Sequence, residues 1–336
     1  MKSQTKRVFA LTMGEPAGVG AEISVKTWKN REKEGLSAFF LIDNHERLSK
    51  TFPDIDIQII NSPGEAFDVF DKALPVMNID LNEDVELGVL NPKNGSAVIQ
   101  SIKKAVNLTL EEKVSGIITN PIHKAALYDI GFEFDGHTEF LANLCQIDHS
   151  PIMMLACSQL KVVPLTIHVA LDKVPSLMSK DLITDMSHRI NDALRIDFGI
   201  QNPRLAITGL NPHAGEGGAM GNEEIEIIEP AIEELRNEGL NVIGPLPADT
   251  AFHEEARQAY DAALCMYHDQ ALIPIKTLDF HGGVNVTLGL PIVRTSPDHG
   301  TALNIAGQDV ANPSSLIAAI KMADMIAKNR ENNNAS

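Results

Sequence analysis

The sequence alternates between short apolar runs and longer amphipathic segments along most of its length. Apolar runs typical of strands covered on both faces occur at 8–13, 39–42, 116–119, 162–167, 205–208 and 262–266. Amphipathic segments typical of helices occur at 97–113, 181–197, 223–237 and 314–328. This alternation predicts an α/β fold with mainly parallel strands.

The composition is that of an ordinary globular protein with an acidic excess. Of 336 residues, 44% are hydrophobic and 22% are charged, and the formal net charge is −17. A chain of this length is long for a single core and natural for two lobes. The negative charge argues against nucleic acid or an anionic membrane as a partner, and an anionic substrate would need local cations.

Targeting and redox features favour a cytoplasmic protein. No apolar run approaches the roughly 20 residues that a membrane span requires. The run at 8–13 is shorter than the core of a secretory signal, so we interpret it as the first strand. Cys145, Cys157 and Cys265 are widely spaced and form no Cys-x-x-Cys motif. We therefore expect reduced, buried thiols.

Polar residues follow apolar runs repeatedly between residues 262 and 307. In open α/β sheets, ligands bind beyond the carboxyl ends of the strands. Two further strand-like runs lie within this segment, at 284–288 and 292–293. The segment also contains two prominent cations, Lys276 and Arg294. We interpret Lys276 as a buried cation and both residues as ligands for substrate anions.

Three histidines follow three of the predicted strands. His168 follows the run at 162–167, His213 comes shortly after 205–208, and His268 follows 262–266. Three imidazoles at one sheet edge are a suitable donor set for zinc or another divalent transition ion. A single histidine is more often a hydrogen-bonded structural residue, and that alternative stays open for each of them.

Other strand-end loops have both a structural and a functional interpretation. Residues 14–20 do not form a G-x-G-x-x-G motif, so they are either a tight turn before a helix or a loop that lines a ligand cleft. Residues 119–124 leave the same alternatives. His137 begins a predicted helix, where it could contact an anion, and Asp249 is either a helix cap or a base. The acidic run at 223–234 is interpreted as a solvated helix face.

Several longer motifs closely resemble those of the 4-hydroxythreonine-4-phosphate dehydrogenase family. They are GEPAG at 14–18, PIHK at 121–124, GHTEF at 136–140, MMLA at 153–156, NPHAGEGG at 211–218, GPLPADT at 244–250, MYHDQ at 266–270 and the run at 283–302. The resemblance extends over nearly the whole chain and is weaker at about 30–110. It implies an enzyme of pyridoxal 5′-phosphate (vitamin B6) synthesis.

A wider resemblance concerns the end of the chain. HGTA at 299–302, IAG at 305–307 and ANP at 311–313 are similar to the nucleotide-binding segment of isocitrate and isopropylmalate dehydrogenases. This implies a two-lobed α/β/α fold without a Rossmann fingerprint and with the active site in the cleft between the lobes. We expect residues 1–135 and 280–336 to form the lobe with the nucleotide segment. Residues 136–279 would form the lobe with the metal ligands and dimer contacts.

The family resemblance also implies roles for individual residues. The implied metal ligands are His168, His213 and His268. The implied substrate ligands are His137, Thr138, Lys276, Asn285 and Arg294. The implied cofactor residues are His299, Gly300, Thr301, Ala302 and Asn312. The implied cofactors are NAD or NADP and one divalent ion, zinc, magnesium or cobalt, in each site of a homodimer whose subunits share their active sites.

The implied reaction is NAD(P)-dependent oxidation of 4-phosphooxy-L-threonine at its 3-hydroxyl. The product, 2-amino-3-oxo-4-phosphooxybutanoate, loses carbon dioxide to give 3-amino-2-oxopropyl phosphate. Asp269, Asp249 and His137 are the candidate bases. The nearest alternative is a paralogous dehydrogenase of 4-phosphoerythronate or 4-phospho-D-threonate. A non-catalytic metabolite-binding protein is disfavoured, because the three histidines occur together with Lys276 and Arg294.

Overall fold

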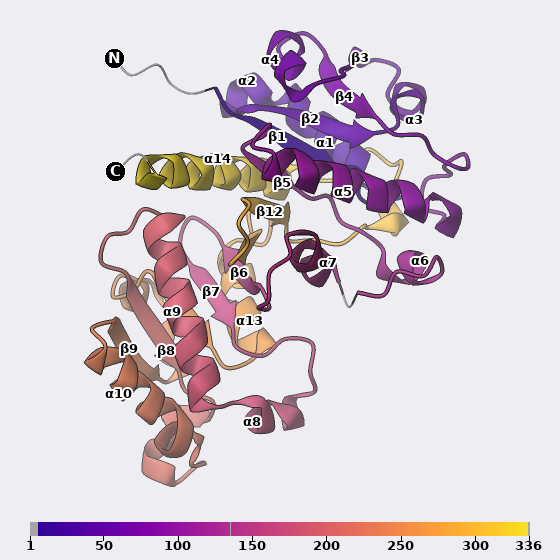
Figure 1. Ribbon diagram of the computed structural model, residues 1–336. Helices are drawn as coiled ribbons and strands as arrows, with labels where there is room; N and C mark the ends of the chain where they lie inside the picture. The colour runs from indigo at the N-terminus through magenta and orange to yellow at the C-terminus, as the bar shows by residue number, and fades with distance from the viewer. Residues whose placement is uncertain (1–5, 135, 335–336) are drawn as a thin grey trace. The chain divides into compact units, whose positions relative to one another are not determined.

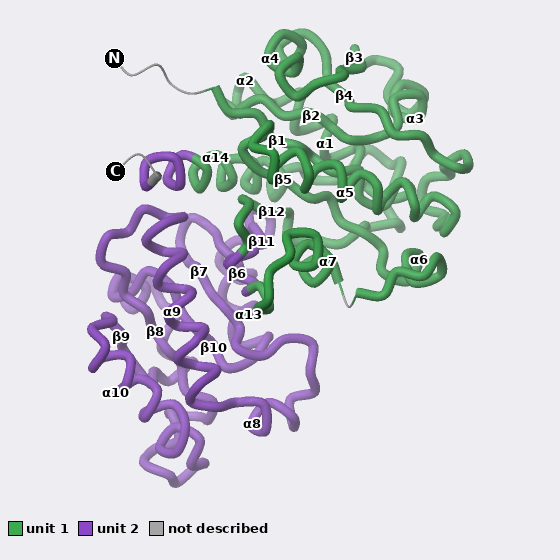
Figure 2. Tube along the Cα trace, viewed as in Figure 1, with its two compact units in different colours: residues 1–151, 290–327 green, residues 152–289, 328–336 purple. Residues whose placement is uncertain are grey.

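The computed structural model describes residues 6–134 and 136–334, and the chain divides into two compact units. Unit 1 comprises residues 1–151 and 290–327, and unit 2 comprises residues 152–289 and 328–336 (Figure 2). Each unit contains strands and helices, which confirms the α/β class. The sequence placed the boundaries at 135 and 280, and helix α7 (His137–Leu144) belongs instead to unit 1.

Unit 1 is built on a sheet with the strand order β3-β4-β2-β1-β5-β12, in which each neighbouring pair is parallel (Figure 1). Its strands are β1 (Val8–Thr12), β2 (Ala38–Asp43), β3 (Ile57–Ile59), β4 (Leu74–Asn78), β5 (Gly116–Ile118) and β12 (Arg294–Pro297). The prediction of a strand at 292–293 is wrong, because pairing with β5 begins at Arg294, opposite Ile117.

The helices of unit 1 follow or separate these strands. They are α1 (Gly20–Lys29), α2 (Arg31–Glu34), α3 (His45–Thr51), α4 (Ala66–Val69), α5 (Gly95–Leu110), α6 (Lys124–Tyr128), α7 and the first part of α14 (Ser314–Asn334). Short 3-10 turns occur at η1 (Pro63–Glu65), η2 (Pro92–Asn94) and η6 (Leu303–Ile305). Helix α5 packs against β1, β2 and β5.

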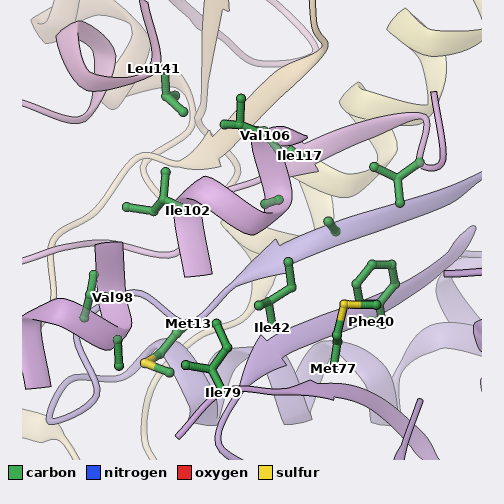
Figure 3. Packing of buried hydrophobic residues seen from close by; sticks show 14 of the residues in the cluster. Met13, Phe40, Ile42, Met77, Ile79, Val98, Ile102, Val106, Ile117 and Leu141 are labelled. Atoms are coloured by element: carbon green, nitrogen blue, oxygen red, sulfur yellow. The ribbon is translucent and has the colours of Figure 1, made fainter. Parts of the chain in front are cut away.

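The periodicity of α5 explains this packing. Val98, Ile102 and Val106 recur at four-residue spacing, so they share one helix face. All three are buried, and they belong to the same hydrophobic cluster as Phe40 and Ile42 of β2 (Figure 3). Burying one such side chain stabilises the fold by roughly 1.5–3 kcal/mol. This apolar layer fixes the strands of unit 1, and their carboxyl ends with them.

Unit 2 is built on a mixed sheet with the strand order β11-β6-β7-β10-β8-β9. Its strands are β6 (Ile152–Ala156), β7 (Lys161–Pro164), β8 (Arg204–Thr208), β9 (Asn241–Leu246), β10 (Ala262–Cys265) and β11 (Val284–Leu288). Strand β6 runs antiparallel to both β11 and β7, whereas β7, β10, β8 and β9 are parallel. The prediction of mainly parallel strands is confirmed.

Among the helices of unit 2, α9 (Lys180–Ile196) matches a predicted helix, whereas α13 (His268–Leu278) was not predicted and another predicted helix is divided. The others are α8 (Val174–Leu177), α10 (Glu229–Asn237), α11 (Ala248–Ala251) and α12 (Glu254–Arg257), with short turns η3 (Leu171–Lys173) and η4 (Pro212–Gly218). The helix predicted at 223–237 is divided into a π-helical turn, η5 (Glu224–Ile228), and α10. Pro230 lies in the first turn of α10, where its missing N–H is tolerated.

The described part of the C-terminal segment, residues 329–334, is helical and is hydrogen-bonded to residue 197 of unit 2. Helix α14 continues to Asn334. The Arg330 guanidinium donates to the Asp197 carboxylate at 2.6 Å, and the Asn329 side chain donates to the Asp197 carbonyl at 2.8 Å.

Within residues 6–134 and 136–334, no helix combines the length and apolar character that crossing a membrane requires.

Candidate active site

Three adjacent parallel strands of unit 2 lead into three histidines. Strand β10 lies between β7 and β8, and all three run in the same direction. His168 follows β7, His213 follows β8 and His268 follows β10, so each lies beyond the carboxyl end of its strand. We call these residues the histidine rim. Their shared placement is the one that the sequence pattern indicated.

His168 and His268 lie close to each other within the rim. Their ring centroids are 5.8 Å apart, and both line a cavity of about 280 Å³ together with Thr166 and Tyr267. The Nδ1 atom of His268 lies 2.7 Å from the Asp269 carboxylate. A carboxylate on Nδ1 fixes the ring and leaves Nε2 for another ligand.

His213 occupies a left-handed segment of backbone. Its φ angle is 54°, and Ala214, Gly215, Glu216 and Gly217 also have positive φ. The φ angle of His168 is 51°. Left-handed backbone is costly for residues other than glycine and is concentrated at functional sites. Both histidines are solvent-exposed.

The histidine rim fits a divalent ion by its donors. Imidazole nitrogens are preferred by zinc and cobalt, and His268 already has the carboxylate contact that orients metal-binding imidazoles. The geometry is less complete than the donor set, because the described residues contain no group of three or more His, Cys, Asp or Glu side chains gathered around one point. The structure therefore brings together His168 and His268, whereas His213 is placed at the same sheet edge on its own loop.

Glu224 was missed as a site-related residue. It is only 1% exposed, so the interpretation of a solvated helix face is wrong at this position. Its carboxylate accepts hydrogen bonds from the backbone N–H groups of Leu210 and Asn211, both at 2.8 Å. The glycine-rich sequence of the loop after β8 was the available signal, because closely packed glycines leave room for a buried group.

Arg294 is a buried cation of unit 1. It begins β12, is 5% exposed, and donates from Nε and Nη2 to the Thr119 hydroxyl at 3.1 and 2.7 Å. Burial lowers the pKa of its guanidinium to about 10, against an opposing effect of the Glu139 carboxylate. Arg294 thus remains charged at neutral pH, and its partial desolvation strengthens any contact with an anion.

His137 is the first residue of α7, as predicted, and Thr138 follows it in the same turn. Burial, with a smaller effect of the Arg294 guanidinium, holds the pKa of His137 well below its ordinary value. Its Nε2 atom is buried and has no hydrogen-bond partner among the described residues. A buried nitrogen of this kind calls for a ligand or ordered water. Unit 1 therefore offers a charged arginine and a neutral imidazole.

Lys276 and Asn285 belong to unit 2. Lys276 lies in the last turn of α13 and is half-buried, so the expectation of a buried cation holds only in part. Its ammonium lies 5.7 Å from the ring centroid of the exposed Phe280. Asn285 lies on β11, and its Oδ1 atom is buried without a partner among the described residues. An unpaired amide oxygen can accept a hydrogen bond from a substrate amine or hydroxyl.

The two carboxylates proposed as bases have different surroundings. Asp269 contacts His268 and thereby takes part in orienting the histidine rim. Asp249 lies exposed in the first turn of α11, whose N-cap position is occupied by Pro247. The structural alternative for Asp249, that of a helix cap, is therefore wrong.

The predicted nucleotide segment lies between β12 and α14 in unit 1. His299 donates from Nδ1 to the Gly300 carbonyl at 2.9 Å, and Ala302 has a left-handed φ of 47°. The Thr301 carbonyl accepts from the Val19 N–H at 3.0 Å. Asn312 accepts from the Ser314 N–H at 2.9 Å and so caps the start of α14. Gly300 is exposed and Ala302 is half-buried, and their small side chains leave room for a ligand to approach the backbone.

The loop at 14–20 packs directly on this segment. A Cβ atom at Gly18 would lie 2.7 Å from the Thr301 carbonyl, which explains the need for glycine. Glu15 is 6% exposed, and burial raises the pKa of its carboxyl even though the Ala17 N–H donates to it. This loop is therefore a tight turn, and it also supports residues 301–302.

Helix α1 holds the other end of the segment. The Lys26 ammonium donates to the carbonyls of Asp309 and Ala311 at 2.8 and 3.0 Å, and to Glu22 at 2.9 Å. The Glu22 carboxylate also accepts from the Ala311 N–H at 2.8 Å. Glu22, Gly18 and Asp309 are among the residues that line a neighbouring cavity of about 280 Å³. Neither Glu22 nor Lys26 was predicted to have a role.

Comparison with known proteins extends over nearly the whole chain. The family model for pyridoxal phosphate biosynthetic protein PdxA matches residues 36–323. The 4-hydroxythreonine-4-phosphate dehydrogenase of Caulobacter vibrioides is 50% identical over 331 residues, covering 97% of this chain and 99% of its own. Crystal structures of 4-hydroxythreonine-4-phosphate dehydrogenases from Klebsiella pneumoniae and Burkholderia phymatum match with TM-scores of 0.86 and 0.81 at 36% and 37% identity. Each covers 96% of this chain and 99% of the solved one.

The fold and the identity to these dehydrogenases define the chain as an oxidoreductase. More specifically, it belongs to the PdxA family of pyridoxal phosphate biosynthetic proteins. Membership in this family of dehydrogenases implies a nicotinamide cofactor.

Proposed function

We propose that the chain oxidises 4-phosphooxy-L-threonine at its 3-hydroxyl with NAD or NADP and a divalent ion. The hydroxyl proton and the hydride on C3 leave, and C3 becomes the ketone of 2-amino-3-oxo-4-phosphooxybutanoate. Loss of carbon dioxide from this 3-oxo acid gives 3-amino-2-oxopropyl phosphate. The observation that carries the proposal is the histidine rim beyond three adjacent parallel strands. It occurs in a chain that is 50% identical to a 4-hydroxythreonine-4-phosphate dehydrogenase.

One divalent ion, held by His168, His213 and His268, would lower the pKa of the substrate hydroxyl and stabilise the charge that develops on its oxygen. The imidazole donors favour zinc or cobalt over magnesium, which prefers oxygen ligands. The contact between Asp269 and His268 supports a role for Asp269 in orienting the ring, ahead of a role as base.

We assign the substrate anions to two cations, assisted by neutral hydrogen-bonding groups. Arg294 is suited to the phosphate or the carboxylate, because its guanidinium is buried and charged. Lys276 supplies a second cation, and Asn285 and Thr138 supply neutral hydrogen-bonding groups. His137 is neutral at pH 7 because its pKa is depressed, so its unpaired Nε2 can donate to the substrate or accept a proton.

For the nicotinamide nucleotide we propose a site on His299, Gly300, Thr301, Ala302 and Asn312. The small residues Gly300 and Ala302, exposed and half-buried respectively, support it, as does the absence of a G-x-G-x-x-G motif after the first strand. The nucleotide accepts the hydride, and the segment would position it. Initial rates with NAD and NADP at equal concentration decide the preference between them.

Turnover by purified protein tests the substrate assignment. The assay compares 4-phosphooxy-L-threonine, 4-phosphoerythronate and 4-phospho-D-threonate, each with zinc, cobalt or magnesium and either nucleotide. The proposal requires kcat/KM to be highest for 4-phosphooxy-L-threonine. A preference for either of the other acids would identify the paralogous dehydrogenase instead.

We also propose a homodimer with shared active sites in the cytoplasm. The three thiols, all unpaired, are consistent with a reducing compartment. Sedimentation of the purified protein tests the dimer, and a fully active monomer would contradict it. Co-refolding His268→Ala with Arg294→Ala tests sharing, because recovered activity requires the two side chains to serve different subunits' sites. No recovery in proven heterodimers assigns both side chains to one subunit's site.

A further inference from the structure

The loops that follow β8 and β10 are joined by one buried amide. Gln270 is 7% exposed, and its Oε1 atom accepts from the Thr208 hydroxyl and the Met266 N–H, both at 2.7 Å. Its Nε2 atom donates to the Gly209 carbonyl, also at 2.7 Å. The carboxyl ends of two strands that lead to His213 and His268 are therefore tied to a single side chain.

A second connection joins β7 to β10. Thr166 lies two residues before His168. Its hydroxyl donates to the Met266 carbonyl at 2.8 Å. Thr166 is 6% exposed, so water competes little for this hydrogen bond. Buried polar side chains thus connect all three strand ends that lead to the histidine rim by hydrogen bonds.

The loop that carries His213 is organised around Glu224. Besides the two backbone N–H groups of Leu210 and Asn211, the Asn211 side chain donates to Oε2 of Glu224 at 2.9 Å. A carboxylate buried to this extent is expensive unless several donors satisfy it. These donors precede His213 directly, so the carboxylate fixes the start of the left-handed segment.

The glycines of the loop are fitted to the same carboxylate. A Cβ atom at Gly215 would lie 2.5 Å from Oε2 of Glu224, and one at Gly209 would lie 3.0 Å from Oε1. Side chains at either position would displace the carboxylate or the backbone. The loop and Glu224 therefore form one packed unit on both sides of His213.

We propose that Glu224 and Gln270 are positioning residues for the metal site, which hold the loops of His213 and His268 in register. This inference rests on the metal assignment in the proposed function. Neither residue needs to contact the ion or the substrate, since both side chains are buried and fully engaged with the loops. Groups that orient metal ligands in this way typically change metal affinity by about 10- to 100-fold when they are removed.

The test measures the dissociation constant for zinc and for cobalt by competition with a chelating dye, without substrate or nucleotide. Glu224→Gln keeps the shape of the side chain but replaces one acceptor oxygen by an NH₂ group that faces N–H donors. Glu226→Gln is the matched control, because the same substitution is made two residues away at an exposed position. The absorption spectrum of bound cobalt reports the ligand geometry, and the thermal midpoint of the metal-free protein reports folding.

The expected result is a dissociation constant at least about tenfold higher for Glu224→Gln, with an altered cobalt spectrum, and an unchanged value for Glu226→Gln. If Glu224 acts through His213, adding Glu224→Gln to His213→Ala causes no further loss of affinity. Metal affinity within twofold of the wild type, with only a lower thermal midpoint, would overturn the proposal and leave Glu224 a purely structural residue.

Gln270→Glu provides a second variant that does not depend on the folding of Glu224→Gln. It keeps the acceptor oxygen for Thr208 and Met266 and loses the donor to Gly209. The same rise in the metal dissociation constant is expected, and unchanged affinity would remove Gln270 from the proposal. Equal metal binding by wild type and His213→Ala would instead defeat the metal assignment itself.

Discussion

The proposed anion-binding groups of unit 1 and the histidine rim of unit 2 differ in how the protein surrounds them. Arg294 and the Nε2 atom of His137 are withdrawn from water by the surrounding protein. His168 and His213 remain exposed, and it is the backbone beneath them that is constrained in left-handed conformations. In unit 1, burial changes the pKa of the proposed ligand groups. In unit 2, hydrogen bonds within the loops fix the positions of the histidines.

This difference matters because the two ligand types make different demands. A phosphate or carboxylate gains most from a cation that has already lost part of its hydration. A divalent ion needs several nitrogens at fixed separations and tolerates exposure. Substitutions should therefore act through the identity of the charged group in unit 1 and through the position of the backbone in unit 2.

Removal of a rim ligand is expected to have the largest effect. His268→Ala should lower kcat by on the order of a thousandfold, since the ion supplies several kcal/mol of charge stabilisation. Metal analysis after dialysis should show lost occupancy with the fold retained. His253→Ala, an exposed histidine of the same unit, is the control. Full metal content and activity in His268→Ala would show that His268 is not a metal ligand.

Arg294→Lys should have the next largest effect and tests whether charge alone suffices in unit 1. The substitution keeps the cation but loses the planar fork that binds phosphate or carboxylate with two hydrogen bonds. We expect kcat/KM for the phosphorylated substrate to fall about tenfold to a hundredfold, the range for lost charge-assisted contacts of roughly 1.5–3 kcal/mol. Wild-type kinetics in this variant would contradict the expected loss and would show that charge alone suffices at position 294, which would sharpen the contrast between the units.

Lys26→Met should have a moderate effect confined to the nucleotide. The substitution removes the donors to the Asp309 and Ala311 carbonyls. At roughly 0.5–1.5 kcal/mol for the lost hydrogen bonding, KM for the nicotinamide nucleotide should rise about twofold to tenfold. KM for the phosphorylated substrate should not change. Lys33→Met, at an exposed position of α2, is the control, and equal behaviour of the two variants would contradict the role of Lys26.

The smallest effect concerns acid stability. The pKa of His137 is depressed in the folded protein, so below about pH 6.5, the ordinary histidine value, the unfolded chain binds a proton that the folded chain does not. Wild-type stability should therefore fall as the pH drops below this value, and His137→Gln should show a weaker decline. Denaturant titrations between pH 5 and pH 8 measure the difference, and parallel profiles would show that burial does not perturb His137.

The strands and the histidine rim were predictable because both are local patterns. An apolar run marks a buried strand wherever it pairs, and a polar residue after it marks the functional edge of a parallel sheet. The same logic missed β3, β4, β6 and β9. In β3 and β4 the apolar runs are interrupted by Gln58 and Pro75. The logic also failed at Arg294, since a charged residue is a poor marker for the start of a buried strand.

The supporting residues were not predictable because their environment is set by distant segments. Glu224 lies in an acidic run that resembles an exposed helix face, and only the approach of residues 209–211 buries it. Glu22 and Lys26 have the spacing of an ordinary helical ion pair. Their contacts with Asp309 and Ala311 cross more than 280 positions of sequence, as the separation of 283 residues between Lys26 and Asp309 shows.

The close fit between Glu224 and the two loop glycines has a consequence for how this protein can diverge. A side chain at 209 or 215 is admissible only where the carboxylate at 224 has shortened or gone, and without that carboxylate the loop N–H groups need new acceptors. A side chain at 209 or 215 is not tolerated while the carboxylate is present, and loss of the carboxylate is not tolerated without new acceptors. The three positions should therefore co-vary among homologues. Grafting the loop onto another scaffold would likewise require transferring the acidic residue from the following helical turn.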